Sequence, residues 1–193
     1  MQKSGIQLVL VVVLTSHLAV GCSTPRREDI QELQGSHPAH RNIPEESVAL
    51  LRDFISYILR LEPDLFHDEV AQKRFLTEEL RKAVAHRWRL YQEFIKKHEA
   101  HSPPSNGTFV GAWEYPSGYT IEGGHHSENQ VIIDVIYKWE NPEANYYGDT
   151  RRVSYTLLLE GGTWKLDDAY THKGEFVPAY SLKKELWRND HQF

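Results

Sequence analysis

The chain has 193 residues, of which 25% are charged, and its formal net charge at pH 7 is −5 with the histidines neutral. Lys3 is the one charged residue before position 22, so loss of residues 1–21 would change the net charge to −6. A mildly acidic chain is a poor match for nucleic acid or anionic lipid headgroups, and we expect no nucleic-acid partner. The 172 residues from Cys22 onward suffice for a hydrophobic core.

Residues 1–21 have the pattern of a secretory signal. A short start containing Lys3 precedes the apolar run 8–14, which is too short to span about 30 Å of hydrocarbon as a permanent helix. The segment Leu18–Cys22 resembles the lipobox cleaved by bacterial lipoprotein signal peptidase, with small residues before a cysteine that carries diacylglycerol. Ala19 stands where that motif usually has leucine. The alternatives are an ordinary secretory signal with an incidental cysteine and an uncleaved anchor.

The resemblance implies a bacterial lipoprotein whose mature chain starts at Cys22. This residue is the only cysteine of the sequence, so it has no disulfide partner, and acylation is its simplest use in an exported protein. Two or more acyl chains, such as palmitate, would attach the chain stably to a membrane. Ser23 stands where inner-membrane lipoproteins usually have Asp, which implies an outer-membrane location, facing the periplasm of the cell envelope.

The composition divides the mature chain into three parts. Residues 22–43 are polar and contain two prolines and a glycine, so we expect a flexible tether. Residues 44–175 are expected to form a single α+β domain. Residues 176–193 are expected to be a C-terminal extension, in which Leu182 and Leu186 have the spacing of a helix.

Two amphipathic helices are predicted at the start of the domain. The first follows Pro44, a residue type favoured in a first turn, and its apolar residues recur at spacings of three and four up to Leu59. The second begins after Thr77, a residue suited to be its N-cap, and continues to Ile95. Its basic outer face is either a docking surface or, as is commoner, a solvated face. Residues 65–75 are expected to connect the two helices.

Most of the chain after residue 107 has the pattern of a sheet. Residues 109–113 are expected in sheet and lead to a turn at 116–118, and residues 123–126, with their two histidines, are expected in a loop. Residues 131–139 form a long β-branched and aromatic run. The glycines at 161–162 predict a tight hairpin turn.

These elements in this order resemble the NTF2-like, or cystatin-like, α+β superfamily. The residues that carry the resemblance are the helix start Phe75–Leu80 and the final hairpin Glu160–Asp168, with the sequence EGGTWKLDD. The resemblance covers about residues 44–172. It implies a cone, in which a curved antiparallel sheet wraps around N-terminal helices and leaves a pocket on its concave side. Members of the superfamily include ketosteroid-isomerase-like enzymes, secretion-system components and exported domains with no known chemistry.

The candidate residues for such a pocket are Asp134, Tyr137, Tyr155 and Asp168. An isomerase-like site needs a carboxylate base and a tyrosine or neutral acid as oxyanion donor inside an apolar cavity. Strand alternation places Asp134 on the face opposite Tyr137, which favours a solvent-facing position. Asp167 and Asp168 alternate, so one of them can point inward. Aspartates at strand ends more usually cap a turn or pair with an arginine, such as those at 151–152.

No complete metal or nucleophile motif is present in the sequence. The histidines at 125–126 are adjacent, and adjacent side chains of an extended segment point apart, so we expect no metal site and no cofactor. The leading hypothesis is a membrane-anchored envelope lipoprotein whose domain binds an envelope protein or a small ligand without catalysis. The alternative is a pocket enzyme of ketosteroid-isomerase-like or hydrolase type, which requires Asp134, Asp167 or Asp168 to face the cavity beside a tyrosine.

Overall fold

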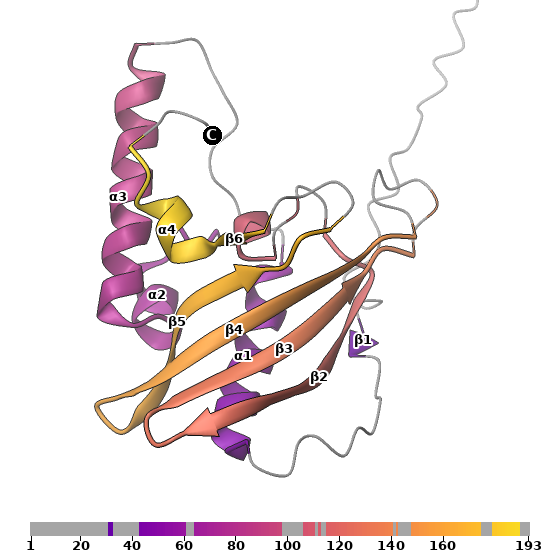
Figure 1. Cartoon of the computed structure of the whole chain (residues 1–193). Coiled ribbons are helices and arrows are strands. Elements are labelled where there is room, and N and C mark those ends of the chain that lie inside the picture. Colours follow the sequence, from indigo (N-terminus) through magenta and orange to yellow (C-terminus); the bar gives the residue numbers. More distant parts are fainter. Residues whose placement is uncertain are drawn as a thin grey trace, which may run out of the picture.

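The computed structural model describes residues 31–32, 43–60, 64–97, 106–110, 112, 115–140, 142, 148–174 and 179–189. These residues form one α+β domain, in which helices pack on a meander of antiparallel strands (Figure 1). The expected α+β class, in a single domain, is therefore confirmed. Cys22 and the rest of the predicted signal lie outside the described residues, as does most of the predicted tether.

Two of the helices begin and end where the sequence predicts. Helix α1 (Glu45–Ile58) follows Pro44, and helix α3 (Glu78–Ile95) follows Thr77, whose side-chain oxygen accepts a hydrogen bond from the backbone N–H of Leu80 at 3.2 Å. This is the geometry of an N-cap. The connecting segment 65–75 contains a helix that was not predicted from the sequence, since helix α2 (Glu69–Phe75) forms there with Asp68 as its N-cap.

The sheet follows chain order from β1 to β6. Its long strands are β2 (Gly118–Ser127), β3 (Gln130–Lys138), β4 (Thr150–Glu160) and β5 (Thr163–Thr171), and each pairs antiparallel with the next. The two-residue strand β6 (Tyr180–Ser181) pairs antiparallel with β5. At the other edge, the two-residue strand β1 (Gln31–Glu32) pairs parallel with β2, within the segment predicted as tether.

The turns of the sheet confirm one prediction and correct two. Gly161 and Gly162 join β4 to β5 with φ of +60° and +80°, a backbone conformation that favours glycine in tight hairpins. Residues 123–126 are not a loop, because they continue strand β2. The expected sheet at 109–113 does not form among the described residues of this stretch, where Asn106–Phe109 make the 3₁₀ helix η2 and the strand starts at Gly118.

The hydrophobic core lies between the sheet and the helices. Helix α1 lies behind the sheet in Figure 1, and α3 stands beside its β5 edge. Helix α1 contributes Phe54, whose ring contacts those of Phe75, Phe109 and Tyr155 at centroid distances of 5.6–6.2 Å. The predicted alternation on β3 is confirmed, because its alternate residues from Val131 to Tyr137 are buried.

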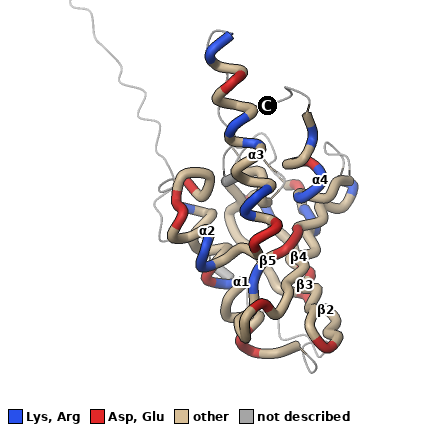
Figure 2. Tube along the Cα trace, turned by 90° about the vertical axis from the view of Figure 1, so that its left-hand side faces the viewer, with Lys and Arg blue, Asp and Glu red and all other residues tan. Residues whose placement is uncertain are grey.

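The predicted C-terminal helix is present and packs against the domain. Helix α4 (Leu182–Leu186) buries Leu182 and Leu186 and lies beside α3 and β5, as Figures 1 and 2 both show. Its N-cap is Ser181, whose hydroxyl oxygen accepts from the backbone N–H of Lys184. Trp187 follows the helix and is 43% exposed.

Candidate functional site

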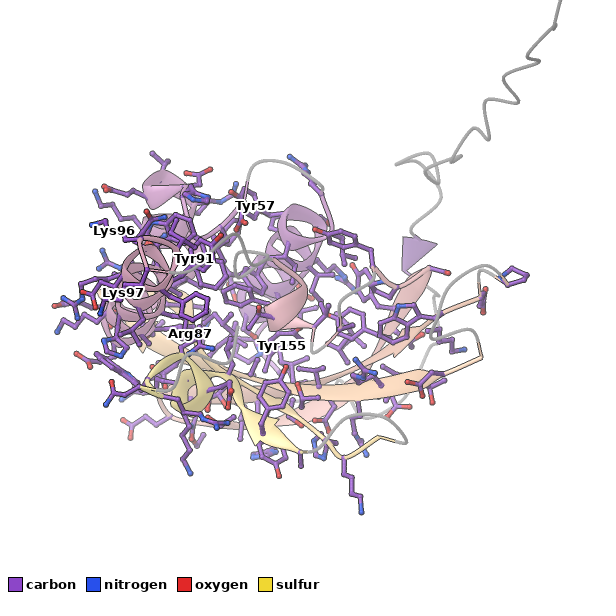
Figure 3. The ribbon with its side chains drawn as sticks, turned by 90° about the horizontal axis from the view of Figure 1, so that it is seen from above. Tyr57, Arg87, Tyr91, Lys96, Lys97 and Tyr155 are labelled. Atoms are coloured by element: carbon purple, nitrogen blue, oxygen red, sulfur yellow. The ribbon has the colours of Figure 1, made fainter. Side chains whose placement is uncertain are left out.

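The two predicted pocket tyrosines meet on the inner face of the sheet. Tyr137 lies opposite Arg151 on the neighbouring strand, whereas Tyr155 lies four residues further along that strand. The two side chains therefore lean towards each other, and their hydroxyl oxygens are 2.6 Å apart. Both residues have 0% exposed surface, and Tyr155 extends from the sheet towards the helix layer (Figure 3). The sequence correctly predicted that Tyr137 faces the core.

A third group, the backbone carbonyl of Phe109, determines the direction of the hydrogen bonds in this pair. The hydroxyl of Tyr155 is 3.0 Å from the backbone oxygen of Phe109, and a carbonyl oxygen can only accept. The single proton of Tyr155 is therefore given to Phe109, and Tyr137 must donate its own proton to Tyr155. Burial raises the pKa of both tyrosines, with the contact between them adding to the rise for Tyr137. Both remain protonated, and both protons are already used.

This arrangement is unlike an oxyanion hole, which must present a free donor to the substrate. The chain of hydrogen bonds ends at Tyr137, whose oxygen retains only acceptor capacity. Among the described residues, no carboxylate or histidine is hydrogen-bonded to either hydroxyl. The two hydrogen bonds of the tyrosine pair therefore link β3, β4 and η2 inside the core.

Arg151 is an inward-facing residue that the sequence interpretation missed. Its side chain has 0% exposure, its guanidinium lies 5.1 Å from the ring centroid of Trp139, and it forms an ion pair with Asp149 at 3.2 Å. On strand β4 the alternate residues Val153, Tyr155 and Leu157 are buried, and one further step back in the same alternation places Arg151 on the inner face. Arg151 was one example of a predicted partner for Asp167 or Asp168, whereas the structure shows it in an ion pair with Asp149.

Asp134 lies on the outer face of the sheet, as its alternation indicated, and not beside the tyrosines. Its carboxylate is 2.5 Å from the hydroxyl of Ser154 and 3.2 Å from the guanidinium of Arg152. Ser154 is also 2.7 Å from Nε2 of His172. Arg152 extends the group by an ion pair with Glu122 at 3.3 Å. On the outer face of the sheet, the group thus links strands β2, β3 and β4 with the residue that follows β5.

The order of these contacts differs from that of a serine hydrolase triad. In a triad the histidine lies between serine and aspartate and accepts the serine proton. Here Ser154 lies between the other two and gives its one proton to Asp134, so Nε2 of His172 must donate to Ser154. His172 is thereby unable to act as the base for Ser154. No local sequence pattern predicts this group, because its members are distant along the chain.

Asp168 has a structural role at the start of α4. One carboxylate oxygen accepts from the backbone N–H groups of Ala169 and Lys183, each at 2.8 Å, and the other accepts from the Ser181 hydroxyl at 2.7 Å. Asp167 accepts from Thr77 at 2.9 Å and from the Lys183 ammonium at 2.6 Å. A bulge in β5 opposite residues 156–157 leaves Asp167 without a partner in the ladder, whereas Asp168 pairs with Thr156. Both carboxylates join the sheet to helices.

The remaining candidates do not form a catalytic set in the part of the chain that the structure describes. His125 and His126 are both exposed, and as neighbours on strand β2 they occupy positions on opposite faces of the sheet. No group of three or more histidine, cysteine, aspartate or glutamate side chains in the described ranges is arranged to hold a metal ion. Within the same ranges, no helix combines the length and apolar character needed to cross a bilayer.

No family model, curated protein or solved structure matches this chain.

Proposed function

We propose that this protein is a lipid-anchored envelope protein of a bacterium, attached through Cys22, whose α+β domain binds an envelope protein or a small ligand without catalysis. The anchor part of the proposal is supported by the signal-like segment 1–21, the lipobox-like Leu18–Cys22 and the use of a single cysteine. Ser23 supports outer-membrane sorting. The domain would then be held at the membrane for a role in the periplasm.

The non-catalytic part is supported mainly by the hydrogen bonding of Tyr137 and Tyr155. Their two protons are used within the pair and by Phe109, so neither is available to a substrate oxyanion. Asp134 is on the opposite face of the sheet, and Asp168 accepts a hydrogen bond from the backbone N–H of Lys183 in the first turn of α4. An isomerase-like site would need one of these carboxylates beside a tyrosine that can donate.

We also propose that the fold is an NTF2-like cone. The support for this finer description is the layer of helices on one face of a meander of four long antiparallel strands, which end in the hairpin Glu160–Asp168. Residues of the superfamily-like helix start, Phe75–Leu80, contact this hairpin directly, since the backbone N–H of Thr77 donates to the carbonyl oxygen of Leu166 at 2.8 Å. The two segments that carry the resemblance are thus neighbours in space.

The anchor is tested by the substitution Cys22→Ser in the full chain, with Ser23→Ala as the matched control. Cells grown with radiolabelled palmitate should label the wild type and the control but not Cys22→Ser, and only the first two should float with membranes. Equal labelling of Cys22→Ser would refute acylation at this residue. Floating of an unlabelled Cys22→Ser chain in its unprocessed form would point to the uncleaved anchor.

The absence of catalysis is tested by complementation in cells that lack the gene. Asp134→Asn and Tyr137→Phe remove the best available base and donor while keeping side-chain shape. If the domain is a binding module, each variant should restore the phenotype in proportion to its folded amount, measured by immunoblot. A variant present at the wild-type level that fails to complement would favour the pocket-enzyme alternative.

A further inference from the structure

The exposed charges of the domain are unevenly distributed. The C-terminal half of α3 and the region of α4 form one surface, which we call the α3–α4 surface (Figure 2). Among the residues that the structure describes, its carboxylates are those of Glu93 and Glu185. Its exposed cations in the described part of the chain are Arg89, Lys96, Lys97, Lys184 and Arg188. Five cations against two carboxylates give the described residues of this surface a net charge of about +3, although the whole chain has −5.

Two cations of this surface, Lys96 and Lys97, differ from the ion-paired cations nearby, among them Arg188, which pairs with Glu185 at 3.1 Å. In the first half of the helix, Lys82 pairs with Glu78 at 3.0 Å and with Glu79 at 2.8 Å. Lys96 and Lys97 form no ion pair with another described residue, and Figure 3 places both on the side of α3 away from the core. Their charge is therefore presented to whatever lies outside α3.

An exposed aromatic side chain accompanies these cations. Trp187 is 43% exposed, and its ring packs against that of His86 with centroids 4.9 Å apart, which joins α4 to α3. Tryptophan beside lysine and arginine is typical of surfaces that lie at the boundary between lipid headgroups and water. The opposite end of the domain is different in character, because its hairpin turns carry the exposed Glu128 and Glu160.

We propose that the α3–α4 surface docks on the anionic lipid headgroups of the membrane that holds the chain's own anchor. This inference rests on the proposed lipidation of Cys22, which would keep the domain close to that membrane. An overall acidic charge disfavours such binding for the domain as a whole, but the charge asymmetry directs one end towards the lipid and the other away from it. A tethered surface also acts at an effective concentration of the order of millimolar, so weak attraction suffices.

The length of the chain before the sheet allows this orientation. Eight residues lie between Cys22 and Gln31, the first residue of β1, and the nine steps from Cys22 to Gln31 reach at most about 30 Å when fully extended. Strands β1 and β5 are four strand spacings apart, or roughly 19 Å. The anchor can therefore enter the bilayer while the α3–α4 surface, beyond the β5 edge, contacts the same bilayer.

The test uses the lipidated full-length mature protein, purified from membranes and reconstituted into vesicles. Because acylation would block Cys22, a single introduced cysteine can carry a fluorophore. Asn189→Cys places it at the α3–α4 surface, and Asn129→Cys places it at the β2–β3 turn as a matched control. The vesicles consist of phosphatidylcholine alone or with phosphatidylglycerol, and both contain lipids with a quenching headgroup.

Docking predicts that the Asn189→Cys label is quenched on the phosphatidylglycerol vesicles and not on phosphatidylcholine, whereas the Asn129→Cys label is quenched on neither. The double substitution Lys96→Glu and Lys97→Glu should reduce the docked fraction relative to the undocked one by more than about tenfold. Lys138→Glu with Lys173→Glu, the same charge change on the sheet side, should leave it unchanged.

Two outcomes would overturn the proposal. One is that both labels remain unquenched on the anionic vesicles. The other is that the Asn189→Cys thiol is shielded from a soluble reagent in intact envelopes but not on anionic vesicles. The α3–α4 surface would then be covered by an acidic protein and not by lipid. Flotation with the phosphatidylcholine vesicles reports separately on the anchor. A protein that fails to float with them but binds anionic vesicles through this surface would support docking and contradict lipidation.

Discussion

The direction of the hydrogen bonds around Tyr155 predicts an asymmetry between two isosteric substitutions. Tyr155→Phe removes the donor to the Phe109 carbonyl and also the acceptor for the Tyr137 proton, so it leaves two buried polar groups without partners. Tyr137→Phe removes one donor and leaves Tyr155 still bonded to Phe109. Tyr155→Phe should therefore be the more destabilising of the two.

The magnitudes follow from the cost of buried polar groups. A lost hydrogen bond costs about 1 kcal/mol net, and each buried group left unsatisfied costs about 1–3 kcal/mol. We expect Tyr137→Phe to lower the free energy of unfolding by about 1 kcal/mol and Tyr155→Phe by about 2–4 kcal/mol. The double variant should cost less than the sum, because it also removes the Tyr137 hydroxyl that the single Tyr155→Phe change strands.

Urea unfolding monitored by tryptophan fluorescence measures these differences through the midpoint at constant m-value. Thermal midpoints provide a second readout, with about 2–4 °C expected per kcal/mol for a domain of this size. If Tyr137→Phe proved more destabilising than Tyr155→Phe, the assigned direction of the hydrogen bonds would be wrong. Tyr137 would then be the inner member of the pair, and Tyr155 could present a proton elsewhere.

Two further predictions concern the rest of the fold. A Cβ at Gly124 would lie 2.0 Å from the carbonyl oxygen of Ile132, so Gly124→Ala should open the β2–β3 pairing and lower the thermal midpoint strongly. The control Gly174→Ala, at a position with open space around it, should have little effect. Equal thermal midpoints for the two variants would contradict this prediction. The backbone N–H of Ala71, and to a lesser extent the Tyr57 hydroxyl, donate to Asp68 and hold the pKa of its carboxyl below the usual value. The ionised Asp68 therefore stabilises the fold above about pH 4, and this stabilisation is lost as the pH falls through the lower pKa of the folded state. Asp68→Ala should accordingly cost about 1 kcal/mol in urea unfolding at pH 7 and clearly less at pH 3, and a cost independent of pH would refute the assignment.

The parts of the fold that were predicted are those with a local cause. Thr77 was recognised as an N-cap because capping needs only a side-chain oxygen before a helical pattern, and Gly161–Gly162 because a tight hairpin needs positive φ. Helix α2 was missed because seven residues are too few for a periodic pattern to stand out. Residues 123–126 were misread because two glycines usually interrupt a strand, whereas here Gly124 allows the close approach of Ile132.

The candidate site was harder to predict, because its geometry depends on register. Alternation placed Tyr137 inside and Asp134 outside, which the structure confirms. It could not show that Tyr155, offset by four residues, meets Tyr137, nor that the proton of Tyr155 goes to Phe109. The roles of the aspartates at 167–168 likewise depend on a bulge and on contacts with α3 and α4, which no local pattern encodes.

Mass spectrometry of the N-terminus of the protein purified from membranes tests the proposed attachment most directly. Trypsin should release the peptide Cys22–Arg26, because Arg26 is the first basic residue after the cysteine. The account predicts this peptide with the added mass of a diacylglyceryl group and an N-terminal acyl chain, and no peptide from residues 1–21. An N-terminal peptide that begins elsewhere, or one that carries an unmodified Cys22 thiol, would contradict the lipid anchor.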